Sequence, residues 1–177
     1  FHSYDNPKTA LVNAKELIDN GAHMVKLEGG VENTDVINAL VSNNIRVCGH
    51  LGLQPQLVVD SSGYKVQGRG EADAQSILDN AMLLESIGVS ILVLECIPSN
   101  IAKLITKKLK IPTIGIGAGK DCDGQVLVSY DMLGITLGRQ PRFVRNFLSS
   151  ESSISSAIKA FVSEVKEGSF PNKSESY

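Results

Sequence analysis

The chain has 177 residues, a formal net charge of −2, 42% hydrophobic and 20% charged residues, and no tryptophan. This composition is typical of a globular domain that buries a core, and the near-neutral charge argues against a general nucleic-acid binder. No apolar run approaches the roughly 18 residues that a membrane span needs, so we expect no membrane partner. The three cysteines stand at unrelated spacings, which favours a reducing cytoplasm over a disulfide framework or a zinc site.

In the first half of the chain, helical apolar spacing alternates with short apolar strands. Asn6 followed by Pro7 is typical of a helix N-cap with proline in the first turn, and Gly21 predicts the end of that helix. The expected elements are a helix with its apolar face over 10–18, a strand over 24–28, a helix over 36–41, a strand over 45–51 and a long loop over 54–70. Within this loop, Gly63 to Arg69 resembles a mobile flap, because loops of this length are often functional.

The second half repeats the scheme. The expected elements are a helix face over 74–84, a strand over 89–96, a helix face over 101–109 with Ser99 as N-cap, strands over 111–116 and 125–128, and a closing helix over 154–165. We expect residues 168–177 to form a flexible tail.

Strands that alternate with amphipathic helices predict an α/β fold with a parallel sheet covered by helices. Two architectures fit the five expected strands. One is an open doubly wound sheet, and the other is part of a (β/α)₈ TIM barrel, which typically needs about 250 residues. On that scale, 177 residues form a barrel only if two or three of its units are missing.

Four polar side chains fall at the carboxyl ends of the expected strands. Lys26 and Glu28 are two residues apart on one strand and so project from the same face, while His50 and Glu95 end the next two strands. Charges in a buried parallel sheet are costly unless they are paired or bind a metal. In both candidate folds the ligand site lies at this edge of the sheet, so the four residues predict a site there.

Each residue also has a purely structural interpretation. Lys26 and Glu28 can form an ion pair, His50 can be a hydrogen-bonded core histidine, and Glu95 can cap the next helix. In a functional site, Glu95 has the chemistry of a carboxylate general base. We interpret Cys48 and Cys96 as buried thiols and Cys122 as incidental.

The glycine-rich stretch Gly115 to Lys120 invites a phosphate-binding interpretation, but it does not fit one. A dinucleotide fingerprint needs glycine where Lys120 stands, and a P-loop needs Ser or Thr where Asp121 stands. The stretch instead predicts a tight turn or a close backbone approach after a strand.

Several motifs occur in a fixed order along the chain. They are MVKLEGG (24–30), VCGHLGLQPQ (47–56), GYKVQGRG (63–70), LVLECIP (92–98), IPTIGIGAG (111–119) and DGQVLV followed by DMLG (123–134). Together they strongly resemble the ketopantoate hydroxymethyltransferase family, and the resemblance covers essentially the whole chain.

The resemblance implies a (β/α)₈ barrel of the phosphoenolpyruvate/pyruvate type, incomplete here at about five of eight strands plus C-terminal helices, in a single partial domain over 1–177. It implies hydroxymethyl transfer from methylene-tetrahydrofolate to α-ketoisovalerate (3-methyl-2-oxobutanoate), with Mg²⁺ or another divalent metal, in pantothenate and coenzyme A synthesis. In that reaction Glu28 is the metal carboxylate, Lys26 binds the keto acid, Glu95 is the general base and His50 has a supporting role. The family also implies a homo-oligomer.

The sequence departs from the family pattern in two ways. Tyr130 stands where family members usually have a histidine, and the metal-binding aspartates of the family are expected upstream of Phe1. The chain is therefore expected to be a fragment that is inactive by itself. A transit peptide in such an upstream segment would make the protein organellar rather than cytoplasmic.

Two further functions stay open from the sequence. One is another metal-dependent barrel acting on α-keto acids, such as a carbon–carbon lyase. The other is a non-catalytic truncated paralogue that assembles with full-length subunits.

Overall fold

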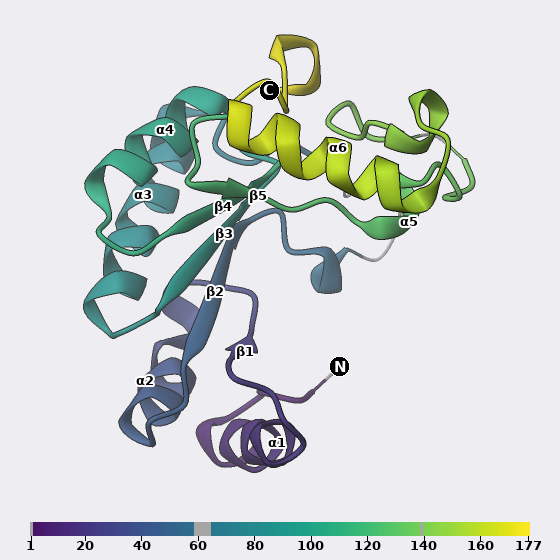
Figure 1. Cartoon of the computed structure of the whole chain (residues 1–177). Helices are drawn as coiled ribbons and strands as arrows, with labels where there is room; N and C mark the ends of the chain where they lie inside the picture. Colours follow the sequence, from purple (N-terminus) through teal and green to yellow (C-terminus); the bar gives the residue numbers. More distant parts are fainter. Residues whose placement is uncertain (1, 59–64, 139) are drawn as a thin grey trace.

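The computed structural model describes residues 2–58, 65–138 and 140–177. Its helices are α1 (Pro7–Asp19), α2 (Thr34–Ser42), α3 (Glu71–Ser86), α4 (Ser99–Lys108), α5 (Ser129–Met132) and α6 (Ile154–Glu167). Its strands are β1 (Val25–Lys26), β2 (Val47–Gly52), β3 (Ile91–Glu95), β4 (Thr113–Ile116) and β5 (Gly124–Gln125). Figure 1 shows their arrangement.

The helix starts follow from local capping chemistry. Asn6 is the N-cap of α1, where its side chain accepts a hydrogen bond of 3.0 Å from the backbone N of Thr9, as the Asn-Pro pair predicts. The prediction of Ser99 as an N-cap was wrong by one residue, because Pro98 occupies the cap of α4 and Ser99 is its first helical residue.

The described strands form one parallel sheet in the order β1-β2-β3-β4-β5. Each strand after β1 therefore pairs with the strand that precedes it in the chain. A doubly wound sheet reverses its strand order at a switch point, and the described strands contain no such reversal. The sheet is thus wound in one direction, as in a (β/α)₈ barrel, and five strands leave it open.

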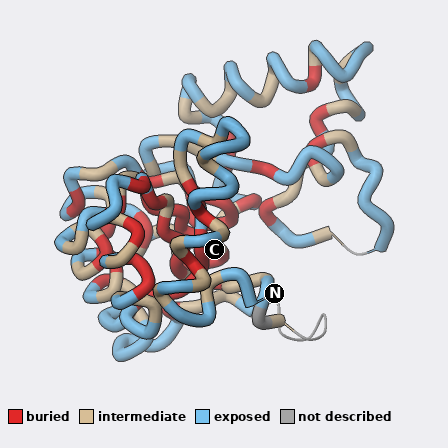
Figure 2. The backbone as a smooth tube through the Cα atoms, turned by 90° about the horizontal axis from the view of Figure 1, so that it is seen from below, coloured by how far each residue is buried: buried red, intermediate tan, exposed pale blue. Residues whose placement is uncertain are grey.

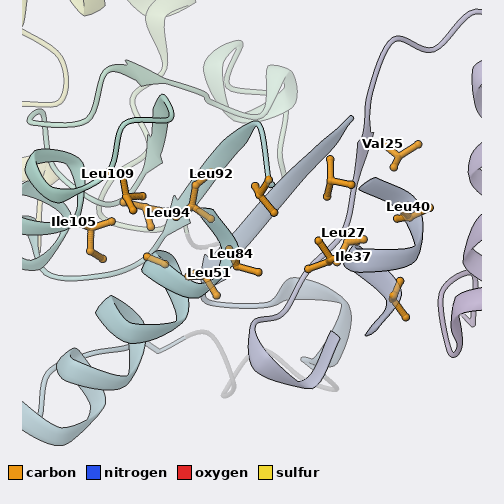
Figure 3. Packing of buried hydrophobic residues seen from close by; sticks show 14 of the residues in the cluster. Val25, Leu27, Ile37, Leu40, Leu51, Leu84, Leu92, Leu94, Ile105 and Leu109 are labelled. Carbon is orange, nitrogen blue, oxygen red and sulfur yellow. The ribbon is translucent and has the colours of Figure 1, made fainter. Parts of the chain in front are cut away.

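The two faces of the sheet belong to different cores. Leu92 and Leu94 pack into a cluster with residues of α1, α2, α3 and α4, whereas Val93 between them packs into a second cluster. This is the alternation that a strand dictates. Figure 3 shows the first cluster, in which Leu51, Leu92 and Leu94 meet the helices. Figure 2 shows that buried residues are concentrated in the body around the sheet.

C-terminal segments supply most of the second cluster. Phe147, Phe161 and Phe170 pack edge to face with ring centroids 5.2–5.6 Å apart. The Arg145 guanidinium lies 5.0 Å from the rings of Phe147 and Phe170 and pairs with Glu164 and Glu175. These contacts fix α6 against the preceding segment.

The segment 168–177, for which the sequence predicts a flexible tail, makes defined contacts in the structure. Phe170 and Glu175 are buried, a 3₁₀ turn spans Lys173–Glu175, and Tyr177 packs edge to face on Phe143. The flexibility of residues 168–177 stays a prediction.

Two loops predicted from glycine patterns can be compared with the structure. Gly63 and Tyr64 of the expected flap lie outside the described residues, whereas Gln67 donates a backbone hydrogen bond of 2.8 Å to the carbonyl of Cys96. After β4, a Cβ on Gly119 (φ +77°) would lie 2.5 Å from Cβ of Ser99. The close backbone approach predicted for this glycine stretch is confirmed.

Among the described residues, none of the helices combines the length and the apolarity needed to cross a membrane.

Candidate active site

Lys26 and Glu28 lie at the edge of the sheet on the face that α1 to α4 do not cover. Val25 and Leu27 alternate with them and pack into the helix-side core. Lys26 Nζ lies 4.0 Å from Glu28 Oε1, and the two side chains differ sharply in exposure, at 46% for Lys26 and 5% for Glu28. The ammonium group can therefore meet a ligand from solvent while the carboxylate stays fixed behind it.

Backbone and side-chain contacts hold Glu28 in place. Its Oε2 accepts a hydrogen bond of 3.2 Å from the backbone N of Gln56, and its carbonyl accepts one of 2.8 Å from Asn33 Nδ2. The next residue, Gly29, donates its N–H to the carbonyl of His50 at 3.1 Å. This backbone hydrogen bond connects the residue after Glu28 to His50, whose side chain separates the carboxylates of Glu28 and Glu95.

His50 lies between the two buried carboxylates. Its Nδ1 is 3.7 Å from Glu28 Oε1, and its Nε2 is 3.0 Å from Glu95 Oε2. His50 is only 2% exposed, yet within the described residues neither ring nitrogen makes a hydrogen bond, because the close Glu95 oxygen is out of line with the ring N–H. A buried imidazole without hydrogen bonds is costly, and both of its nitrogens face carboxylates, those of Glu28 and Glu95.

The end of β3 sets the position of Glu95. Its carbonyl accepts a hydrogen bond of 2.9 Å from Leu53, and a Cβ on the paired residue Gly52 (φ +94°) would lie 2.1 Å from that same oxygen. On the other side, Cys96 donates to the carbonyl of Ile116 at 2.9 Å. With its backbone held on both sides, Glu95 presents a carboxylate whose side chain is 13% exposed.

The neighbouring thiols are not poised as nucleophiles. Burial, and secondarily the charge of Glu95, raise the pKa of Cys96 to about 12. Burial also raises the pKa of Cys48, although the charge of Lys26 opposes the rise. Both thiols therefore stay protonated near neutral pH.

The described residues do not form a metal centre by themselves. Glu28 offers one carboxylate, one oxygen of which already accepts a hydrogen bond, and nowhere in 2–58, 65–138 and 140–177 do three acidic, His or Cys side chains group as metal ligands. Mg²⁺ prefers octahedral oxygen coordination. A magnesium ion at Glu28 would need further oxygen ligands.

The structure brings together all four residues that the sequence predicts for the site. It adds two that sequence reasoning missed, namely Gln56, through its backbone N–H to Glu28, and Gly52, through its approach to Glu95. Both stand inside the VCGHLGLQPQ motif. The motif therefore contained these residues, but it did not indicate which atoms they bring close to Glu28 and Glu95.

Comparison with known proteins identifies the family. The family model described as ketopantoate hydroxymethyltransferase matches residues 1–173. The chain belongs to this family. Its members are one-carbon transferases with a barrel of the phosphoenolpyruvate/pyruvate type, which agrees with the single direction of winding in the sheet.

Curated relatives are similar to the chain over nearly its whole length. The 3-methyl-2-oxobutanoate hydroxymethyltransferase of Vesicomyosocius okutanii is 54% identical over 100% of this chain and 68% of its own length. The enzymes of that name from Buchnera aphidicola (strain 5A) and Shewanella denitrificans are 49% and 51% identical, over 100% and 98% of this chain and 67% and 66% of theirs. The chain thus spans about two thirds of the length of these ketopantoate hydroxymethyltransferases.

Among solved structures, a sugar phosphate isomerase/epimerase from Parabacteroides distasonis has a TM-score of 0.41 and 12% identity over 65% of this chain and 51% of its own. That similarity is too weak to inform either fold or function.

Proposed function

We propose that this chain carries the base and the keto-acid contact for the transfer of a hydroxymethyl group from methylene-tetrahydrofolate to 3-methyl-2-oxobutanoate, giving ketopantoate. The observation that supports this is the gathering of Lys26, Glu28, His50 and Glu95 on one face of the sheet, with contacts of 3.0–4.0 Å between neighbours. The family match favours this transfer over the cleavage of a carbon–carbon bond.

Lys26 is suited to bind the carboxylate of the keto acid. Its ammonium group is partly exposed, and the buried Glu28 carboxylate lies 4.0 Å behind it. A charge-assisted hydrogen bond to the substrate carboxylate would fix the orientation of the keto acid. The carbon next to the ketone can then face the end of β3.

Glu95 is suited to take the proton from that carbon. Proton removal leaves an enolate. Water supplies the hydroxyl oxygen: it adds to the methylene carbon of the folate, and its two protons go to the two folate nitrogens as both carbon–nitrogen bonds break. The enolate electron pair attacks the resulting formaldehyde-level carbon, whose oxygen takes up a proton, so that the products are ketopantoate and tetrahydrofolate. Because Glu95 is fixed through its backbone and only slightly exposed, its carboxylate reaches the substrate without much reorganisation. We assign His50 the supporting role of positioning this carboxylate.

The proposed transfer also requires a divalent metal ion. Residues other than those described would have to complete its ligand set around Glu28. The steps above therefore involve only the side chains of this chain.

A cytoplasmic homo-oligomer is the form in which we propose that this protein acts. The bacterial relatives support the compartment. An exposed apolar stripe on α6, formed by Ile154, Ile158 and Val162 at 41–55% exposure, supports assembly. Neither a nucleic acid nor a membrane is part of the proposal.

A segment exchange tests the activity. Residues 1–177 would replace the matching segment of the Vesicomyosocius okutanii enzyme, to which they are 54% identical, with the unmodified enzyme as control. We expect the exchanged protein to form ketopantoate from 3-methyl-2-oxobutanoate and methylene-tetrahydrofolate. A correctly folded exchange product that forms no ketopantoate, or that cleaves oxaloacetate instead, would contradict the proposal and favour a non-catalytic paralogue or a lyase, respectively.

A further inference from the structure

A pocket of about 610 Å³ lies between α3 and α4, outside the cluster around His50. Its volume is in the range of small-molecule sites. Ala74 and Leu78 of α3 and Ile101 and Leu104 of α4 form an apolar wall. This wall is suited to a flat apolar group.

Two arginines and a tyrosine line the rim of this pocket. They are Arg69, Arg142 and Tyr177, and the acid among the lining residues is Glu71. Arg142 is held in place because its Nε donates to the carbonyl of Ser174 at 2.7 Å and its guanidinium lies 5.9 Å from the Tyr177 ring. Burial raises the pKa of Tyr177, and the charges of Arg142 and Arg69 oppose the rise.

The pocket is connected to the catalytic edge of the sheet. Pro98, which lines it, follows Glu95 by three residues, a distance of at most about 10 Å along an extended chain. The strand end is also tied to the pocket wall, because Gln67, next to the lining residues Val66 and Gly68, donates its backbone N–H to Cys96 at 2.8 Å. A ligand that extends over this edge of the sheet can contact both the pocket and Glu95.

We propose that the pocket binds the 4-aminobenzoyl-glutamate part of the folate co-substrate. The benzoyl ring would pack on the apolar wall and the glutamate carboxylates would pair with Arg69 and Arg142. This inference rests on the proposed function, which requires the one-carbon unit of the folate beside Glu95. The rest of the folate must then leave the site over the sheet edge, where the pocket begins.

The test measures the affinity of the 177-residue chain for N-(4-aminobenzoyl)-L-glutamate by isothermal titration calorimetry. Arg69→Gln removes one rim charge, and Ala74→Phe fills the apolar wall. Arg46→Gln is the matched control, because Arg46 is an exposed arginine just before β2, at the opposite end of the sheet. Circular dichroism confirms that each variant is folded.

We expect Arg69→Gln and Ala74→Phe each to weaken binding about tenfold, and Arg46→Gln to change it less than twofold. 4-Aminobenzamide, which lacks the two carboxylates, should bind more weakly and should not respond to Arg69→Gln. The assignment is wrong if the unaltered chain fails to bind the probe at millimolar concentration, or if Arg69→Gln and Ala74→Phe bind it like Arg46→Gln.

A parallel titration separates this inference from the proposed function. Binding of 3-methyl-2-oxobutanoate should depend on Lys26 and not on Arg69. Loss of keto-acid binding with intact, Arg69-dependent binding of the probe would contradict the proposed function alone. Keto-acid binding that depends on Lys26, without Arg69-dependent binding of the probe, would contradict the pocket assignment alone.

Discussion

His50 Nε2 lies 3.0 Å from Glu95 Oε2, and both side chains project from the face of the sheet that α1 to α4 leave uncovered. The histidine is almost fully buried, and within the described residues its ring makes no hydrogen bond. We propose that it acts as a spacer that sets where the Glu95 carboxylate can lie.

The first prediction concerns this spacer. In the segment-exchanged enzyme, His50→Ala should lower kcat roughly 10²-fold, because a displaced base loses its orientation toward the substrate, while the affinity for the keto acid changes little. His50→Gln should recover part of the rate, since its amide can occupy the place of Nε2. Cys48→Ala, two residues earlier on the same face, is the control. A full rate in His50→Ala would show that His50 only fills space.

A second prediction concerns Gly52, whose missing Cβ leaves room for the carbonyl of Glu95. Gly52→Ala should destabilise the chain by about 3 kcal/mol or more, because the new methyl group would lie 2.1 Å from that oxygen. Gly21→Ala is the matched control, since Gly21 has a similar φ of +99° and open space around its Cβ position, and should cost only about 1–2 kcal/mol. Urea unfolding measures the free energy of unfolding of both variants. Equal destabilisation would mean that backbone strain at positive φ, and not the contact with the Glu95 carbonyl, causes the effect of Gly52→Ala.

The third prediction concerns the pH dependence of folding at the C-terminal clamp. Burial raises the pKa of Glu175, but hydrogen bonds from Arg145 and Asn172 and the Arg145 charge outweigh it, so the net shift is downward. A lowered folded-state pKa contributes stability above the unfolded value of about 4.5, and this is lost as pH falls through the folded value. Glu175→Gln should therefore cost about 1–3 kcal/mol at pH 7 and flatten the decline in stability below pH 4.5.

Thermal unfolding as a function of pH measures this effect. Glu167→Gln on the exposed side of α6 should leave the profile unchanged. If Glu175→Gln keeps the same acid decline as the unaltered chain, the clamp does not contribute through Glu175.

The sequence predicted much of the fold because strand alternation is a local property. Val25 and Leu27 pointing one way and Lys26 and Glu28 the other follow from spacing alone. The single direction of winding, by contrast, depends on which strands pair with one another. The sequence therefore left a doubly wound sheet and a partial barrel open, and the strand order of the sheet distinguishes them.

Features made by residues distant in the chain were not predictable. The polar composition after Phe170 predicts a free tail and gives no sign of the long-range pair of Arg145 with Glu175. The pocket between α3 and α4 needs Arg69 and Arg142 from separate segments. Likewise, the placement of His50 between two carboxylates depends on strand register, which spacing within one strand does not encode.

Proton exchange at the keto acid tests most directly whether Glu95 is the base, as we propose. The measurement is the rate at which the segment-exchanged enzyme replaces the C3 hydrogen of 3-methyl-2-oxobutanoate with deuterium, followed by NMR in D₂O, with Glu16→Gln on the exposed side of α1 as control. Glu95→Gln is expected to bind the keto acid nearly as well as the unaltered protein and to exchange the proton about 10²–10⁴-fold more slowly. Unchanged exchange in Glu95→Gln would show that another residue removes the proton.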